Sequence, residues 1–429
     1  MIKTFSLLAL TLVFTGMTAC SQPSPQKILV QDINPEAKVE LEALKRELNV
    51  STIRDLKDQK SEIWQIPKGK EDQLQEAIRS LKNAQELNLT ALQQDYRQLF
   101  VRPSQSPQLS EAQNRLLEHM KSEKIASGRV SLFELNEMPF VLHGLTKGFD
   151  QRDGFPDRGT LKIQLSPEEQ LSVVKTESSL TDGGYIWKGS VKEKDGDVML
   201  LANGDSITGS LNLKGKVYSI RPLGKGMHAV IEKRTDAFPD DHPPRFQKTA
   251  EEANQARDMP PSPPLDRNER VDIDLLVAYT KRVTRIYHNV ENDLIRLALA
   301  ELNASVRQSS LGRIRFRLVH SYETKYEETG NWDDHLIKIK PEINQKRQEH
   351  SADIGILIVD DGDYCGEAAQ IRASKSKAFC VVHHNCATGY YSFGHEIGHL
   401  FGARHDRYVD NETTPFPYGH GFLNGNQWR

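Results

Sequence analysis

The sequence predicts a mixed α/β domain in the C-terminal part of the chain, because strand-like and helix-like segments alternate there. Residues 271–279 are typical of a buried strand, and residues 314–319 and 353–359 predict further strands. Residues 283–309 repeat apolar side chains at helical spacing, and a second helix is expected around residues 333–350. This order predicts a sheet with helices packed against it.

Residues 21–125 are predicted to form a helical N-terminal region. The segments EAKVELEALKRELN and KEDQLQEAIRSLKNAQELNLTALQQDYRQLF space their leucines three and four residues apart, as amphipathic helices do. A small helical packing unit is the interpretation we favour, and a surface that binds a partner is the alternative.

Residues 126–258 are predicted to form a β-rich module. Short alternating segments occur there, with Asp195-Gly196 and Asn203-Gly204 between them as two-residue hairpin signals. A linker is expected at residues 259–267, because four prolines within seven residues prevent a helix or a central strand. This linker is a candidate site for proteolytic processing, and residues 268–429 form the domain that follows it.

Residues 1–20 are predicted to be an export signal. Lys3 precedes an apolar run from Phe5 to Phe14, which is too short for a good membrane span. The small residues before Cys20 resemble a bacterial lipobox, although Met17 stands where leucine is more usual. We favour lipid attachment at Cys20 over ordinary secretion, and we expect any membrane attachment to occur through this lipid alone.

The charge of the chain gives no electrostatic reason to expect nucleic acid as a partner. The formal net charge is -3 at pH 7, with 56 basic and 59 acidic residues. The cysteines agree with export, because Cys365, Cys380 and Cys386 cluster within one short segment. At least one disulfide is expected, and three buried thiols are the alternative.

Residues 395–405 carry the most specific chemical pattern in the chain. His395 and His399 are four residues apart, so a helix would place both imidazoles on one face, where they can share a metal ion. Glu396 would point away from that axis and could reach a metal-bound water without occupying a coordination position. The pattern therefore predicts two ligands and a general base.

A third ligand is expected after a turn. Gly402 can adopt the left-handed conformation that ends a helix, and the chain can then bring His405 back to the same ion. Three protein ligands leave a fourth position open, which distinguishes catalytic zinc from structural zinc.

At these residues the sequence resembles the metzincin metalloproteases, whose motif HExxHxxGxxH is matched by HEIGHLFGARH. The aspartate directly after the third histidine, Asp406, resembles the pattern of the adamalysin or reprolysin branch. The longer segment CATGYYSFGHEIGHLFGARHD is similar to that of bacterial peptidyl-Asp metalloendopeptidases. The resemblance implies a twisted mixed sheet above an active-site helix. It also implies that His395, His399 and His405 bind zinc, and that Glu396 is the general base.

The resemblance implies two further features. Relatives suggest a Cys365–Cys386 disulfide, which would leave Cys380 unpaired unless its partner lies further along the chain. Metzincins carry a methionine turn after the third histidine, whereas no methionine follows Met259 here. PFPYGHGF at residues 415–422 resembles the segment that leads to that turn, so we expect the catalytic domain to be C-terminally truncated.

The β-rich region from residue 126 to 235 resembles the propeptides of reprolysin-like proteases, which implies a latent precursor. A cysteine cannot block the metal from this region, because the sequence contains none between Cys20 and Cys365. Asp240, Asp241 or His242 could cap the metal, but we favour an exposed proline-rich loop for this segment.

Several groups near the motif have ordinary structural interpretations. CGEAAQI is the better candidate for the edge strand that receives a peptide substrate, ahead of KAFCVVHH. His383 and His384 should point to opposite faces of a strand and are expected to be structural or to line the active site. Asp360, Asp361 and Asp363 could bind calcium, although a turn after a strand is the preferred interpretation.

The sequence therefore predicts an exported zinc endopeptidase that acts on proteins or peptides and is made as a latent precursor. Glu396 would take a proton from the attacking water and return it to the leaving amine. The alternative is a non-enzymatic surface lipoprotein with a structural zinc site. Cleavage at aspartate is suggested by resemblance only, and Arg404 or Arg407 could supply positive charge near the site.

Overall fold

The computed structural model separates the chain into two compact units, Met1–Asp95 with Arg152–Pro156, and Tyr96–Gln151 with Asp157–Arg429. It describes residues 26–31, 35–48, 50–56, 61–66, 70, 73–74, 88–91, 98–103, 107–123, 126–136, 160–181, 184–191, 195–204, 206–243 and 269–422. The predicted export signal, Cys20 and the predicted linker at residues 259–267 lie outside these residues.

The first unit contains an antiparallel sheet with strand order β2-β3-β1-β4. Its elements are β1 (Gln26–Gln31), α1 (Pro35–Leu48), β2 (Ser51–Leu56), β3 (Ser61–Ile66) and β4 (Asn88–Ala91). The prediction of a helical region at residues 21–125 is therefore wrong where β1 to β4 lie, and most of the second predicted amphipathic segment, residues 70–100, lies outside the described residues. The leucine spacing identified α1, but β2 and β3 carry β-branched and aromatic residues such as Ile53 and Trp64, which favour strands.

The second unit begins with a nine-stranded antiparallel sheet of order β5-β6-β13-β12-β11-β10-β9-β8-β7. Its strands are β5 (Phe100–Val101), β6 (Ala126–Leu135), β7 (Thr160–Gln164), β8 (Gln170–Thr181), β9 (Gly184–Val191), β10 (Gly196–Asn203), β11 (Ser206–Leu213), β12 (Lys216–Gly224) and β13 (Met227–Lys233). The amide of Leu99 donates to the carbonyl of Lys162 at 2.8 Å, so the two edges of this sheet meet. When the two edges of a sheet meet, few backbone groups stay unpaired and available to another chain.

Helix α3 (Glu111–Ser122) belongs to this sheet and not to the first unit. Ser110 and Gln113 form a capping box at its start, and Leu116 and Met120 pack against β6, β12 and β13. The predicted hairpin at Asn203-Gly204 is confirmed, because Asn203 pairs with Ser206 and Gly204 has a φ of +62°.

The C-terminal part forms the predicted mixed sheet, with order β15-β14-β16-β18-β17. The strands are β14 (Val271–Tyr279), β15 (Ile314–Glu323), β16 (Ile354–Val359), β17 (Gly366–Ala368) and β18 (Phe379–His383), and the helices include α7 (Arg296–Gln308), α8 (Asp333–Glu349) and α9 (Ser392–Leu400). β17 alone runs antiparallel to its neighbour.

Short helical turns complete the second unit. They are η2 (Thr235–Ala237), α6 (Lys281–Thr284), the π-helical turn η4 (Glu291–Ile295) and η5 (Lys375–Lys377). The helix predicted at residues 283–309 is therefore divided into α6, η4 and α7, with a non-helical turn between α6 and η4.

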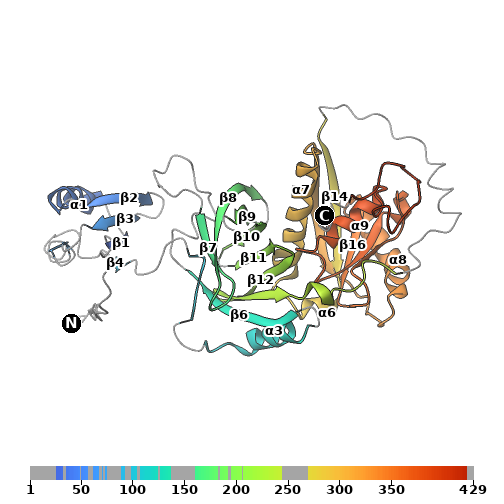
Figure 1. The fold of residues 1–429 in the computed structure, drawn as a ribbon, viewed down its shortest axis with the longest axis horizontal. Helices are drawn as coiled ribbons and strands as arrows, with labels where there is room; N and C mark the ends of the chain where they lie inside the picture. The colour runs from blue at the N-terminus through green and yellow to red at the C-terminus, as the bar shows by residue number, and fades with distance from the viewer. Residues whose placement is uncertain are drawn as a thin grey trace. The chain divides into compact units, whose positions relative to one another are not determined.

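Both faces of the mixed sheet are buried. Leu275 and Val277 of β14 pack with α7 and α9, whereas Leu276 and Ala278 pack with α8 on the opposite face. Figure 1 shows α7 between the two sheets of the second unit, where it also contacts β9 and β10 through Leu297. One helix therefore contributes to the core of the mixed sheet and to its contact with the nine-stranded sheet.

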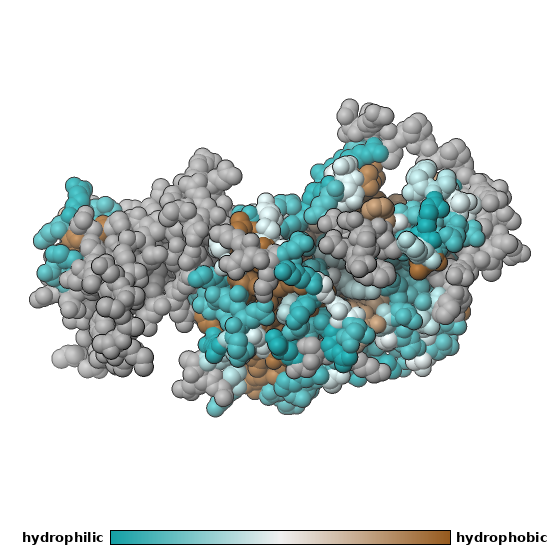
Figure 2. Space-filling model, viewed as in Figure 1, coloured by the Kyte–Doolittle hydropathy of each residue, from teal (hydrophilic) through white to brown (hydrophobic). Residues whose placement is uncertain are grey.

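The described surface of the second unit is mostly hydrophilic on the face shown in Figure 2, with apolar residues in small groups. Among the described residues, no helix has the length and apolar character needed to cross a bilayer.

Candidate metal centre and peptide edge

Helix α9 presents two histidines on one face. His395 and His399 lie one helical turn apart, and their Nε2 atoms are 3.0 Å from each other. The ring of His399 is fixed by its Nδ1, which lies 2.8 Å from the carbonyl oxygen of Ala403. Because that contact requires a proton on Nδ1, the lone pair of His399 is on Nε2.

The predicted turn after α9 is present at Gly402. Its φ is +100°, and the amides of Gly402 and Ala403 donate to the carbonyls of His399 and Gly398. These two hydrogen bonds form a Schellman motif, which ends a helix with a residue of positive φ. The turn directs the chain back toward the face that carries His395 and His399.

His405 is held in place by the segment that follows it. Arg404 donates from its amide to Gly419 at 2.7 Å and accepts from the amide of Gly421 at 2.9 Å. Nδ1 of His420 lies 2.8 Å from the carbonyl of His405. Sequence reasoning noted residues 415–422 only as a resemblance and missed this support, for which the glycines around His420 were the available signal.

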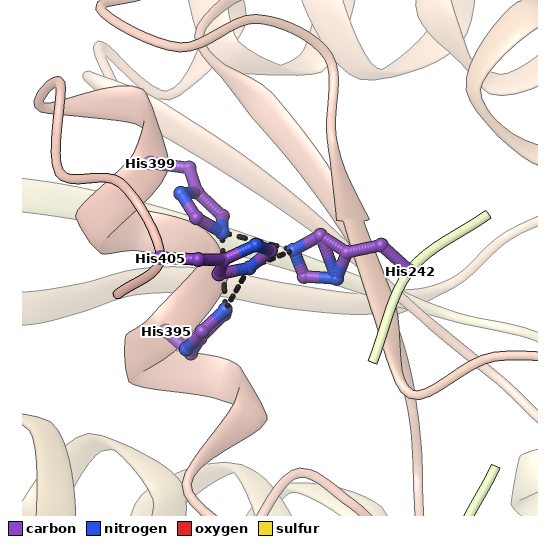
Figure 3. A group of neighbouring side chains, drawn as sticks. All are labelled: His242, His395, His399 and His405. Atoms are coloured by element: carbon purple, nitrogen blue, oxygen red, sulfur yellow. Dashed lines mark hydrogen bonds between the residues drawn. The ribbon is translucent and has the colours of Figure 1, made fainter. Parts of the chain in front are cut away.

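A fourth histidine joins the three from the motif. Figure 3 shows His242 pointing at the same centre as His395, His399 and His405, from a segment far away in the sequence. Nε2 of His242 lies 2.9 Å from Nε2 of His399 and 3.1 Å from that of His405, and the side chain is only 5 % exposed. The preferred interpretation of an exposed loop is therefore wrong for His242, because its backbone segment is anchored on the mixed sheet.

Desolvation at the histidine cluster favours the neutral imidazole form of these rings. Desolvation, reinforced by the neighbouring histidines, lowers the pKa of His395 to about 4 and that of His242 to about 2. Burial also lowers the pKa of His399 well below its usual range and lowers the pKa of His405. Neutral imidazole is the form of histidine that binds metals.

The four ring nitrogens fit a zinc ion. The Nε2 atoms of His395 and His405 are 3.2 Å apart. In the pairs His242–His399, His395–His399 and His242–His405 the Nε2 atoms are 2.9–3.1 Å apart. A tetrahedral ion with Zn–N bonds of about 2.0–2.1 Å would separate its ligand atoms by about 3.3 Å. Small outward movements of the rings are thus enough to hold the ion, and histidine nitrogen is a preferred zinc donor.

Glu396 lies beside this centre with its carboxylate buried. The residue is 1 % exposed, and its Oε1 lies 3.8 Å from Nε2 of His242. Its Oε2 has no hydrogen-bond partner among the described residues. Burial raises the pKa of Glu396 well above its usual range, and the nearby carboxylates of Glu367 and Asp241 raise it further.

β17 is the edge strand next to the centre, as predicted for CGEAAQI. Its outer edge is paired with the segment that carries His242. The amide of Cys365 donates to the carbonyl of Asp240 at 2.9 Å, and the amide of Gly366 donates to that of Asp241 at 3.1 Å. The disulfide Cys365–Cys386, suggested by resemblance, is present and joins this edge to the loop before α9, while Cys380 is a buried free thiol.

His383 and His384 do not point to opposite faces, and that expectation is wrong. β18 ends at His383, so the alternation of a strand stops there, and the two rings lie 4.6 Å apart. Both side chains are buried, as expected of structural residues. Nε2 of His384 lies 3.1 Å from Asp360, and its Nδ1 lies 3.1 Å from the hydroxyl of Tyr287.

The acidic turn and the two arginines are engaged in local contacts. Asp361 lies 3.1 Å from Nε2 of His335 and accepts from the amide of Asp363 at 3.3 Å. Arg404 is buried and pairs with Asp410 at 2.6 Å, whereas Arg407 donates to the carbonyl of Pro417. Arg404 therefore stabilises the loop that carries His405.

Comparisons with known proteins agree with this geometry. The Reprolysin_5 model, described as metallopeptidase family M12, matches residues 269–423. A peptidyl-Asp metalloendopeptidase of Xanthomonas campestris pv. campestris is 32 % identical over 330 residues, which cover 71 % of this chain and 78 % of that protein. This chain belongs to metallopeptidase family M12. It is a zinc metalloendopeptidase that acts on proteins or peptides.

Two further proteins are similar to this M12 peptidase. A peptidyl-Asp metalloendopeptidase of Stenotrophomonas maltophilia is 32 % identical over 306 residues, which cover 63 % of this chain and 70 % of that protein. The crystal structure of metalloproteinase-II from Bacteroides fragilis covers 58 % of this chain and 81 % of its own, with 11 % identity and a TM-score of 0.36. The family assignment depends on the sequence relatives and not on this structural likeness.

Proposed function

We propose that the chain is the latent precursor of an exported zinc endopeptidase in which His395, His399 and His405 bind the catalytic zinc and Glu396 is the general base. The observation that supports this most directly is the convergence of three Nε2 atoms from one short motif beside a buried carboxylate. His395 and His399 come from α9, and the Schellman turn at Gly402 returns His405 to them.

Zinc, when bound, supplies a Lewis acid that polarises the scissile carbonyl and acidifies the attacking water. The residues of the chain perform the remaining steps. Glu396 takes a proton from that water and returns it to the leaving amine. The outer edge of β17 pairs with an extended peptide and orients it across the centre.

The region before the catalytic domain is proposed to restrain it. Residues 1–20 would direct export, with a lipid on Cys20 placing the protein at the cell surface, and unmodified secretion as the alternative. The region of residues 21–258 would act as the pro-region, and cleavage near residues 259–267 would release the domain of residues 268–429. The names of the relatives support cleavage at aspartyl peptide bonds. Calcium at Asp360, Asp361 and Asp363 stays a prediction.

A peptide library provides the test. It is incubated with the full chain and with chain that has been cut within residues 244–268 and separated from its N-terminal fragment. We expect cleavage after separation that a zinc chelator abolishes. Glu396→Ala should lower this cleavage roughly 10²–10⁴-fold without loss of bound zinc. Glu327→Ala, which removes an exposed carboxylate of the same domain, is the matched control.

The alternative function is a non-enzymatic binding module with a structural zinc site. Four converging histidines favour it, because structural sites are closed by a fourth protein ligand. Glu396 argues against it, since a structural site gains nothing from a buried carboxylate that does not bind the metal. One bound zinc without chelator-sensitive cleavage in the separated form would support this alternative.

A further inference from the structure

We propose that His242 is the fourth protein ligand of the metal in the precursor, and that the segment Phe238–His242 closes the metal position and the peptide-binding edge together. We name this segment the capping segment. The inference rests on the proposed function, because it assigns the means by which that same site is kept inactive.

The ring of His242 occupies the fourth corner of the histidine cluster. Its Nε2 is as close to His399 and His405 as the motif histidines are to one another, at 2.9 and 3.1 Å. The four ligand atoms all lie within 4.8 Å of one another. A catalytic zinc needs a position for water and substrate, so a fourth imidazole there makes the site inert.

The backbone of the capping segment occupies the edge that a substrate would need. β17 pairs with β18 on one side, and no strand of the described sheet pairs with its other edge. Asp240 forms a parallel bridge with Tyr364, and the amides of Cys365 and Gly366 donate to the capping segment. A peptide cannot add to this edge while those groups are paired.

Side chains anchor the capping segment at two further points. The ring of Phe238 stacks on Tyr390, with centroids 4.4 Å apart and planes inclined by 11°. The hydroxyl of Tyr390 donates to Asp241 at 3.1 Å. Since Tyr390 lies five residues before His395, these contacts tie the capping segment to the start of α9.

The capping segment is presented by the nine-stranded sheet. β13 ends at Lys233, whose Nζ donates to the carbonyl of Asn385 at 2.6 Å. Arg221 of β12 is buried, pairs with Glu123 at 3.0 Å and donates to Asn385. These contacts hold the sheet against the catalytic domain, so the imidazole of His242 has a high effective concentration at the metal site.

A closed metal site in the precursor is compatible with an active enzyme, because the fourth ligand comes from outside the catalytic domain. His242 lies outside the domain of residues 268–429, so departure of the nine-stranded sheet removes one ligand and leaves three. The metal then regains an open position and β17 regains a free edge in a single step.

Cobalt(II) replaces zinc in the experiment, because its visible absorption reports the number of ligands and their exchange. The full chain is loaded with Co²⁺ as wild type, His242→Ala, His242→Gln and His119→Ala. The last variant is the matched control, because His119 is an exposed histidine on α3 of the same sheet module. Azide is then titrated into each protein as a small ligand for an open position.

We expect the spectra of wild type and His119→Ala to be unaffected by azide. The spectrum of His242→Ala should change and saturate with azide, and its affinity for Co²⁺ should fall at least tenfold. His242→Gln preserves much of the side-chain volume and should behave in the same way, which covers a loss of folding in the alanine variant. Melting curves verify that the compared variants are folded.

Azide binding to wild type and His242→Ala with equal affinity would overturn the capping role of His242 and leave the three-histidine site intact. Failure of wild type to bind Co²⁺ at all would overturn the proposed function as well. The two failures are therefore distinguished within one set of spectra.

Discussion

A Cβ atom on Gly366 would lie 2.4 Å from Oε1 of Glu396. The edge strand and the proposed base are thus in direct contact, and any side chain at position 366 would require Glu396 to move. The same backbone unit donates its amide to Asp241 of the capping segment. Gly366 therefore links the position of the base to the edge that receives a peptide.

Gly366→Ala should displace the carboxylate of Glu396 while leaving the metal site intact. We expect kcat of the processed enzyme to fall by roughly 10²-fold, since a misplacement of about 1 Å has effects of this size. Bound zinc should stay at the wild-type level. Gly312→Ala is the control, because the nearest atom to its added Cβ is 3.8 Å away. Equal kcat values for the two variants would contradict this role of Gly366.

The extent to which the sequence predicts the site depends on how local each contact is. His395, His399 and His405 are linked by one helix and one turn, so their spacing predicts their convergence. His242 joins them through pairing with β17, more than a hundred residues further along the chain, which no local pattern encodes. The leucine spacing of two segments predicts a helical region over residues 21–125, but residues 51–66, which lie between those segments, form β2 and β3.

Gly402→Ala should weaken metal binding through the position of His405. The new Cβ would lie 2.8 Å from Cε2 of Phe416, and the φ of +100° adds backbone strain. We expect the free energy of unfolding to fall by about 1–3 kcal/mol. The affinity for zinc should also fall, as measured by competition with a chromogenic chelator. Gly330→Ala is the matched control, since its φ is +74° but no atom of the described residues lies within 4 Å of the added Cβ. A similar zinc affinity in both variants would argue against this coupling.

Glu301 should make the precursor less stable as the pH rises from 5 to 7. Burial raises the pKa of Glu301 to about 7, and its carboxylate accepts hydrogen bonds from Ser210 and from the amide of Gly389. Since the folded state holds this proton more tightly than the unfolded state, the stabilisation is complete below the unfolded pKa and is lost as the pH rises through about 7. The resulting change in the free energy of unfolding is about 3 kcal/mol at most.

Glu301→Gln should therefore make the change in melting temperature from pH 5 to pH 7 more positive than in wild type. Other groups keep a pH dependence of their own, because burial also raises the pKa of Asp293 to about 7, with the same sign, whereas the lowered pKa values of buried histidines such as His384 and His399 act in the opposite sense. Lys233 faces Glu301, and burial lowers its pKa to about 7, so its own effect begins only above that pH. Glu327→Gln, at an exposed carboxylate, is the control, and an unchanged pH dependence in Glu301→Gln would disprove the assignment.

A cut within residues 244–268 should not by itself separate the capping segment from the catalytic domain. The contacts that hold it join the nine-stranded sheet, on the N-terminal side of the cut, to the catalytic domain. They include the hydroxyl of Thr208, which donates to the carbonyl of Asp293 at 2.9 Å, and the guanidinium of Arg221, which donates to the side chain of Asn385. We expect the cut chain to elute as one species in size-exclusion chromatography and to show two bands on a denaturing gel.

Arg221→Ala should make the two fragments of the cut chain separate more readily. The substitution removes the hydrogen bond from Arg221 to Asn385 of the catalytic domain. It also leaves the carboxylate of Glu123, which accepts from Asn385 at 3.0 Å, buried at this interface without its cation, which costs roughly 3–5 kcal/mol. Arg115→Ala is the matched control, because Arg115 is exposed on α3 and pairs there with the exposed Glu111. Peptide hydrolysis measured on the same fractions should appear only where the fragments have separated. Immediate separation of the wild-type fragments, with full activity, would show that the linker and not the packed interface keeps the site closed.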